Sequence, residues 1–139
     1  MRVNEVSQQA IQGTVGQIKV SLLPYRYPTL RRCRHFRELS CDVAAVDDLA
    51  AMKIGAIAQR GLKRDFVDVW ALLQSGWTIA KLIRAYQTRY NVHGTAHVLI
   101  ALTYFDDTNK HSIPRMLWPV RWPQIRRDIE QAVQEFSNK

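Results

Sequence analysis

Hydrophobic and polar residues follow two different periods, one at the start of the chain and another after residue 46. Residues 3–23 alternate apolar and polar side chains, are interrupted at Gly13 and end at Pro24. Alternation with a period of two, broken by glycine, is typical of an antiparallel hairpin. From residue 46 onward the apolar residues recur three and four positions apart, which predicts amphipathic helices.

The helical part of the pattern separates into five segments, with glycine or proline at most of the breaks. These segments cover about residues 46–60, 63–73, 77–90, 95–104 and 123–137. A short strand at about 41–44 precedes the first of them. The sequence therefore predicts one domain over residues 1–139 with an α+β fold. In it a small, mainly antiparallel sheet, made of the N-terminal hairpin and the short strand, packs against about five α-helices.

Net charge adds a preference for polyanionic partners. The chain carries 20 Lys and Arg against 12 Asp and Glu, a formal net charge of +8, and such an excess attracts polyanions. Arginines are concentrated between residues 26 and 37, with aromatic residues interleaved. Arginine and aromatic side chains together neutralise phosphates and stack on bases, so the candidate RNA-binding residues are Arg31, Arg32, Arg34 and Arg37. A solvated basic loop is the equal alternative.

Location and redox chemistry follow from what the sequence lacks. No apolar run is long enough to span a bilayer, and the first ten residues lack the apolar block of a signal peptide, so a cytoplasmic location is expected. Cys33 and Cys41 do not have Cys-x-x-Cys spacing and are expected to be free thiols. No metal ligands are identified in the chain, and His97 is expected to be a packing residue.

Two cations and two carboxylates stand at helical spacings within residues 43–73. Lys53 interrupts an apolar run, and Arg60 follows seven residues later on the same face of the first helix. Asp65 and Asp68 are neighbours on the surface of the second helix. One interpretation is a core helix pair with internal ion pairs, because a lysine in an apolar run needs a partner or a path to solvent. The other is an anion site in which Lys53 and Arg60 hold nucleotide phosphates.

The same stretch resembles a known family, the AbiEii/AbiGii type of nucleotidyltransferase toxin. In that family a lysine is followed by an arginine, and then by a basic residue, an aspartate and a second aspartate. The matching positions here are Lys53, Arg60, Arg64, Asp65 and Asp68. The likeness continues in residues 97–107 and 114–125 and covers roughly residues 14–136.

The resemblance implies a partial nucleotidyltransferase-like fold and a role in a toxin–antitoxin or phage-defence system. In that reaction an acceptor hydroxyl, with the 3′ end of a transfer RNA as one candidate, attacks the α-phosphate of a nucleoside triphosphate bound with Mg²⁺. By the same resemblance Lys53, Arg60 and Arg64 bind the nucleotide, and Asp65 and Asp68 are catalytic. The implied protein partner is a cognate antitoxin or a separate N-terminal half of the enzyme.

One motif of the family is absent from this chain. The family holds its metal with Asp-x-Asp on an early strand, after a Gly-Ser or Gly-Gly-Thr turn. The Gly-Thr pairs here, at residues 13–14 and 94–95, are not followed by Asp-x-Asp at a workable distance. The chain therefore resembles the C-terminal portion of such an enzyme and is expected to be inactive alone. A truncation, a split gene and a stand-alone module remain open. So do a non-catalytic RNA- or protein-binding module and an inactive remnant.

Overall fold

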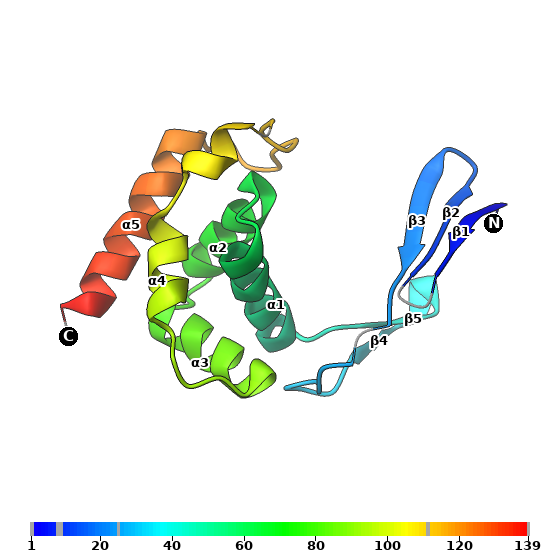
Figure 1. Ribbon diagram of the computed structural model, residues 1–139, viewed down its shortest axis with the longest axis horizontal. Coiled ribbons are helices and arrows are strands. Elements are labelled where there is room, and N and C mark those ends of the chain that lie inside the picture. The colour runs from blue at the N-terminus through cyan, green and yellow to red at the C-terminus, as the bar shows by residue number, and fades with distance from the viewer. Residues whose placement is uncertain (1, 8–9, 25, 111, 139) are drawn as a thin grey trace.

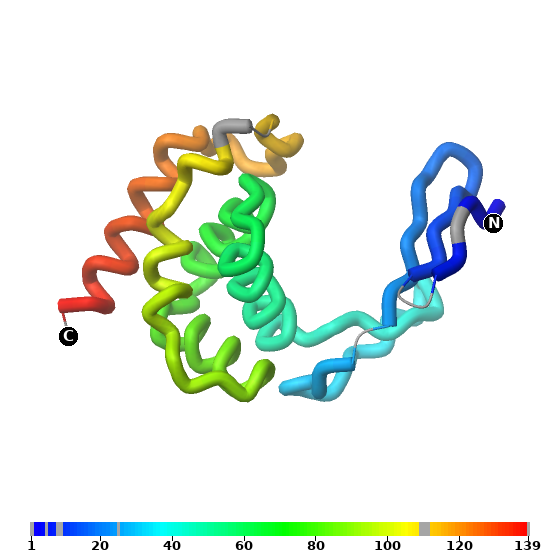
Figure 2. Tube along the Cα trace, viewed as in Figure 1, coloured from blue at the N-terminus to red at the C-terminus, as the bar shows by residue number. Residues whose placement is uncertain are grey.

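The computed structural model describes residues 2–7, 10–24, 26–110 and 112–138, and its strands and helices form two separate groups (Figure 1). The strands come from the first part of the chain, and the helices come from the remainder. The first strand and the end of the last helix lie at opposite ends of the longest axis (Figure 2).

The N-terminal strands form a three-stranded antiparallel sheet in the order β1-β2-β3. Their bounds are β1 Arg2–Val6, β2 Ile11–Val15 and β3 Ile18–Leu22. The turn between β2 and β3 contains Gly16, whose φ of +61° suits a residue without a Cβ. A second, two-stranded sheet pairs β4 Arg34–Phe36 with β5 Cys41–Val43. The predicted hairpin therefore gains a third strand, and the short strand near residue 41 pairs in a sheet of its own.

Five α-helices follow at the positions that the apolar spacing predicts. They are α1 Val46–Gln59, α2 Lys63–Gln74, α3 Ile79–Tyr90, α4 Ala96–Thr103 and α5 Trp122–Ser137. Local chemistry sets the ends of α3: the Thr78 hydroxyl accepts a hydrogen bond from the Lys81 N–H at 3.3 Å. Asn91 ends the same helix in the left-handed region. The predicted α+β class is confirmed. None of the described helices is both long and apolar enough to cross a membrane.

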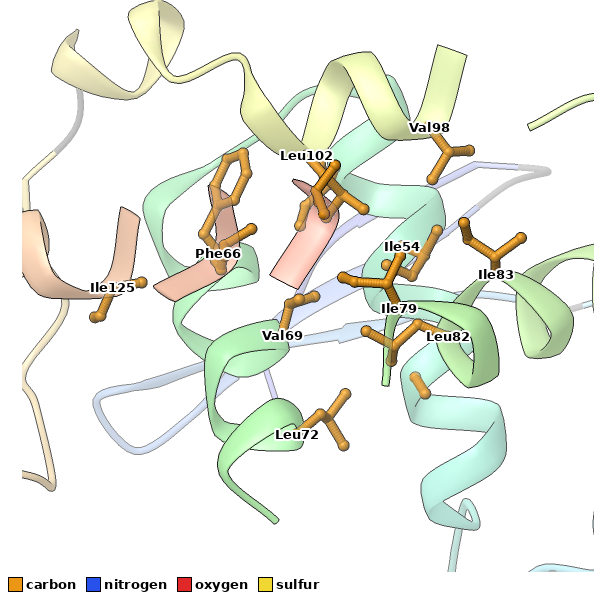
Figure 3. Packing of buried hydrophobic residues seen from close by; sticks show 14 of the residues in the cluster. Ile54, Phe66, Val69, Leu72, Ile79, Leu82, Ile83, Val98, Leu102 and Ile125 are labelled. Carbon is orange, nitrogen blue, oxygen red and sulfur yellow. The ribbon is translucent and has the colours of Figure 1, made fainter. Parts of the chain in front are cut away.

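The hydrophobic core lies within the helical body. Helix α1 packs against α2, α3 and α4, and α5 packs against the same three helices. The largest fully buried apolar side chains include Ile54, Phe66, Leu82, Leu102 and Ile125 (Figure 3). Aromatic rings of Phe66, Phe105 and Trp122 meet tilted or edge-on, with centroids 5.0–6.0 Å apart.

The placement of the sheet differs from the prediction. Both sheets stand away from the helices (Figure 1), and the described buried apolar residues all lie at or beyond Ala50. Among the strand residues whose burial is described, only Gly13 is buried. The physical reason is that the helices bury their apolar stripes against one another, so the helical core forms without the sheet.

Candidate functional site

Lys53 of α1 lies against two carboxylates of α2. Its Nζ is 3.3 Å from Asp65 Oδ1 and 2.5 Å from Asp68 Oδ2. Arg60, directly after α1, places Nε 3.4 Å from the other Asp65 oxygen, Oδ2. We call these four residues the charged cluster. The structure therefore brings together four of the five residues that the sequence assigned to nucleotide binding and catalysis.

A sharp turn between the two helices assembles the charged cluster. Gly61 follows Arg60 with a φ of +53°, in the left-handed region that glycine adopts without a Cβ penalty. Its N–H donates a hydrogen bond to the Ala56 carbonyl at 3.2 Å, which closes the end of α1. The chain then enters α2 directly, so α1 and α2 lie side by side. Lys53 and Arg60, two helical turns apart, can both reach Asp65.

Asp65 is the buried centre of the charged cluster. Its side chain is 0% exposed, against 23% for Lys53, 44% for Asp68 and 53% for Arg60. A buried carboxylate persists when it is paired and hydrogen-bonded, and here two cations supply those bonds. The internal ion pairs expected from the sequence are therefore confirmed. The enclosed position of Asp65 suits a residue that holds Lys53 and Arg60 in place, whereas Asp68 and Arg60 are accessible to solvent.

Arg64 lies outside the charged cluster. Its side chain is exposed and makes no ion pair with the residues that the structure describes. It borders a separate hollow of about 280 Å³, together with Lys63 and Pro114. Its predicted role in nucleotide binding has no geometric support from the other four residues, and it stays a prediction.

An open hollow of about 830 Å³ borders the charged cluster at Arg60. One wall comes from the chain after β3, including Arg26 and Tyr27, and the other comes from α1 and Tyr90. The Tyr27 and Tyr90 rings meet edge to face, with centroids 4.7 Å apart. Gly55 leaves room for Tyr90, because a Cβ at residue 55 would lie 3.1 Å from the Tyr90 hydroxyl. The hollow has the size of a small-molecule site and presents two guanidinium groups.

Most of the basic stretch at residues 26–37 is exposed, and Arg26 at its start lines the hollow beside Arg60. Arg31 pairs with Asp47 at 3.3 Å and shares a hollow of about 550 Å³ with Lys81 and Arg84 of α3. Exposed arginines that make no ion pair with described residues complete the stretch: Arg32, Arg34 and Arg37. The structure thus adds Lys81 and Arg84 to the predicted basic surface, an addition that only the packing of α3 beside Arg31 reveals.

The described residues do not offer a magnesium site. They contain no group of three or more His, Cys, Asp or Glu side chains able to hold a metal ion. Asp65 and Asp68 share the Lys53 ammonium, so they are neutralised by a cation instead of converging on a vacant centre. Magnesium prefers a near-octahedral set of oxygen ligands, and this pair does not supply it.

Sequence reasoning missed a second buried ion pair, between Asp48 and Arg89. The Asp48 carboxylate contacts the Arg89 guanidinium and also accepts the Leu30 N–H at 2.7 Å and the Arg31 N–H at 3.1 Å. Both side chains are nearly inaccessible, at 1% and 3% exposed. A signal was present, because Arg89 lies three residues after Tyr86 and continues the apolar stripe of α3. This pair ties the chain that leaves the sheet to the helical body.

The fold is a helical body joined to a small sheet, with the charged cluster where α1 meets α2, and comparison with known proteins supplies its family. Residues 9–138 match the family described as "Nucleotidyl transferase AbiEii toxin, Type IV TA system". The chain therefore belongs to the AbiEii family. It is similar to uncharacterized protein aq_aa25 of Aquifex aeolicus (strain VF5), with 32% identity over 120 residues that cover 86% of this chain and 57% of the relative. The chain thus spans less than two thirds of that relative. No solved structure matches it.

Proposed function

We propose that this chain supplies the phosphate-binding helices of a nucleotidyltransferase toxin that acts with a cognate antitoxin. The observation that carries the proposal is the charged cluster, in which family-motif residues form a compact, partly open group of two cations and two carboxylates. The cluster opens at Arg60 onto the 830 Å³ hollow, which is large enough for a nucleotide.

In the proposed reaction an acceptor hydroxyl attacks the α-phosphate of a nucleoside triphosphate and pyrophosphate leaves. Lys53 and Arg60 stabilise the negative charge on the phosphates, while buried Asp65 keeps both cations in position. When Lys53 turns to a phosphate, Asp68 loses its 2.5 Å partner and becomes free to orient the nucleotide or accept a proton. The carboxylates that would hold Mg²⁺ come from outside the described residues, so the chain on its own binds nucleotide without transferring it.

Substitution of Lys53 tests this assignment. Lys53→Ala removes one of two cations at the phosphates, and we expect affinity for ATP, GTP, CTP or UTP to fall about tenfold or more. Calorimetric titration measures that loss. The matched control is Lys19→Ala, an exposed lysine on β3 that lies outside the charged cluster and the hollow beside Arg60, which should leave affinity unchanged. Circular dichroism checks that both variants keep their helices. Unchanged affinity in Lys53→Ala would remove Lys53 from the site.

RNA binding by the basic stretch is a second candidate function. The supporting observation is that Arg32, Arg34 and Arg37 project exposed guanidinium groups that described residues do not neutralise. This surface could hold an RNA acceptor, such as a transfer RNA, for the proposed transfer.

A salt titration tests the RNA proposal. Each phosphate contact to a single strand adds about 0.7 to the slope of log affinity against log salt. We therefore expect replacement of Arg32, Arg34 and Arg37 by alanine to weaken binding of a transfer RNA and to reduce that slope by about 2. Arg121→Ala, an exposed arginine just before α5 and outside the basic stretch, is the control. Binding that is absent in the parent chain, or that does not vary with salt, would refute this second function.

A further inference from the structure

The three-stranded sheet has one face made almost entirely of apolar residues. Residues directly opposite each other on antiparallel strands point to the same side of the sheet. Ile11 pairs with Leu22, Gly13 with Val20 and Val15 with Ile18. These three pairs alternate with polar pairs such as Gln12 with Ser21, so β2 and β3 present an apolar face and a polar face.

Strand β1 joins the same face through an irregularity in its pairing. Val6 lies opposite Ile11 and Val3 lies opposite Gly13, with a shift in register between Val3 and Glu5. Because a bulge inserts one extra residue, two valines three positions apart can both point to one side. We call the resulting surface the apolar sheet face. Its members are Val3, Val6, Ile11, Gly13, Val15, Ile18, Val20 and Leu22.

The helical body leaves the apolar sheet face open. Ile18 is 70% exposed, Val6 is 69% exposed and Leu22 is 54% exposed, and the sheet stands away from the helices (Figure 1). A contiguous apolar surface of this kind marks an interaction site. The face also meets the surface around the charged cluster, since Leu23 and Pro24 line both the 830 Å³ hollow beside Arg60 and a hollow of about 340 Å³ beside Ile11 and Leu22.

The dimensions of the face favour one kind of occupant. Three strands about 4.8 Å apart and five residues long give a surface of roughly 14 by 17 Å. One amphipathic helix of about three turns covers such a length. The face alone covers roughly 240 Å², well below the ~800 Å² per partner of a stable interface, so a docked segment needs further contacts, which the adjoining hollows at Leu23 and Pro24 offer.

The greater length of the relative aq_aa25 offers a source for such a helix. The 120 matched residues make up 57% of aq_aa25, so the relative carries a large segment that this chain does not span. We propose that the apolar sheet face docks an amphipathic helix from that unmatched segment of the family, and that the docked segment borders the charged cluster at Arg60. Docking needs no nucleotide, so it can hold or fail independently of the proposed transfer reaction.

A binding experiment without nucleotide tests the proposal. The probe is the longest stretch of aq_aa25 outside the match, produced separately and mixed with the full chain. We expect a one-to-one complex by sedimentation velocity. Ile18→Lys places a charge in the apolar contact and should weaken the complex about tenfold or more. The matched control is Ser21→Lys, on the same strand but on the polar face, which should bind like the parent chain.

Each outcome decides the matter. Loss of binding in Ile18→Lys but not in Ser21→Lys supports docking on the apolar sheet face. Equal binding by the two variants, or no complex with the parent chain, overturns the proposal. A dimer of the chain alone that Ile18→Lys dissociates would assign the face to a second copy and overturn the proposed occupant. Circular dichroism checks that the helical body of each variant stays folded, and Ser21→Lys, on the same strand, controls for disruption of the sheet.

Discussion

The helical body and the three-stranded sheet both have apolar faces, with different periods along the chain, but they differ in what covers those faces. In the body, Ile54, Phe66 and Leu82 are 0% exposed, because five helices enclose one core. In the sheet, Ile18 and Val6 remain about 70% exposed. Periodicity dictates which element forms and which face is apolar, but it does not specify what covers that face. An element whose apolar face is complete but exposed to solvent, as in this sheet, therefore indicates that a binding partner of that face is missing.

The connection between the two regions is polar. Asp48, buried at the start of α1, accepts the Leu30 and Arg31 N–H groups and pairs with Arg89 of α3. Arg31 also pairs with Asp47, and the Tyr27 and Tyr90 rings meet edge to face. The position of the sheet relative to the charged cluster therefore depends on a few hydrogen bonds and ion pairs, with little buried apolar area between the two regions.

Among the substitutions considered, removal of the Asp48 carboxylate should cause the largest loss of stability and the largest release of the segment that connects the sheet to the helical body. Asp48→Ala leaves the Arg89 charge buried without its partner and two backbone N–H groups without an acceptor. Breaking a buried ion pair costs about 3–5 kcal/mol, and each orphaned buried N–H adds about 1–3 kcal/mol unless water reaches it. Urea unfolding followed by circular dichroism measures the loss. Trypsin should also cut faster after Arg31, Arg32 and Arg34, because their segment is released.

The neighbouring aspartate provides the control. Asp47→Ala removes an exposed ion pair with Arg31, and exposed pairs contribute about 0–1 kcal/mol. It should leave both unfolding and tryptic cleavage close to those of the parent chain. If Asp48→Ala behaved like Asp47→Ala, the buried pair would not be what attaches the sheet to the body.

Elements and motif residues could be predicted from the sequence because local chemistry decides them. Gly61 ends α1 and apolar spacing places all five helices. The i, i+3 spacing of Asp65 and Asp68, opposite Lys53 and Arg60, anticipated the ion pairs that the structure shows.

Tertiary arrangement decided what could not be predicted. The sheet was expected to pack on the helices because a strand that leads into a helix commonly belongs to a sheet that covers that helix. Instead, the helices bury their apolar stripes against one another. Arg89 was overlooked because a single arginine within an apolar stripe gives no direction to a partner 41 positions earlier, at Asp48. The burial of Asp65 and the isolation of Arg64 likewise depend on how α1 and α2 face each other, which spacing alone does not give.

A pair of truncations, one in each region, tests the comparison directly. Phe66→Ala removes a fully buried ring that contacts Phe105 and Trp122, and we expect it to lower the free energy of unfolding by about 3–5 kcal/mol. Ile18→Ala shortens a side chain that is already 70% exposed, so its cost should stay within about 0.5 kcal/mol. Urea unfolding at 222 nm compares the two on one scale.

The smaller of these two effects is the more informative. If the apolar sheet face is open in the isolated chain, Ile18 gains little from folding, and the alanine variant should differ from the parent only when the docking segment is present. A cost of several kcal/mol for Ile18→Ala in the chain alone would mean that something already covers the face, either the helical body or a second copy. Repeating the measurement at two protein concentrations separates them, because stabilisation by a second copy rises with concentration and packing within one chain does not.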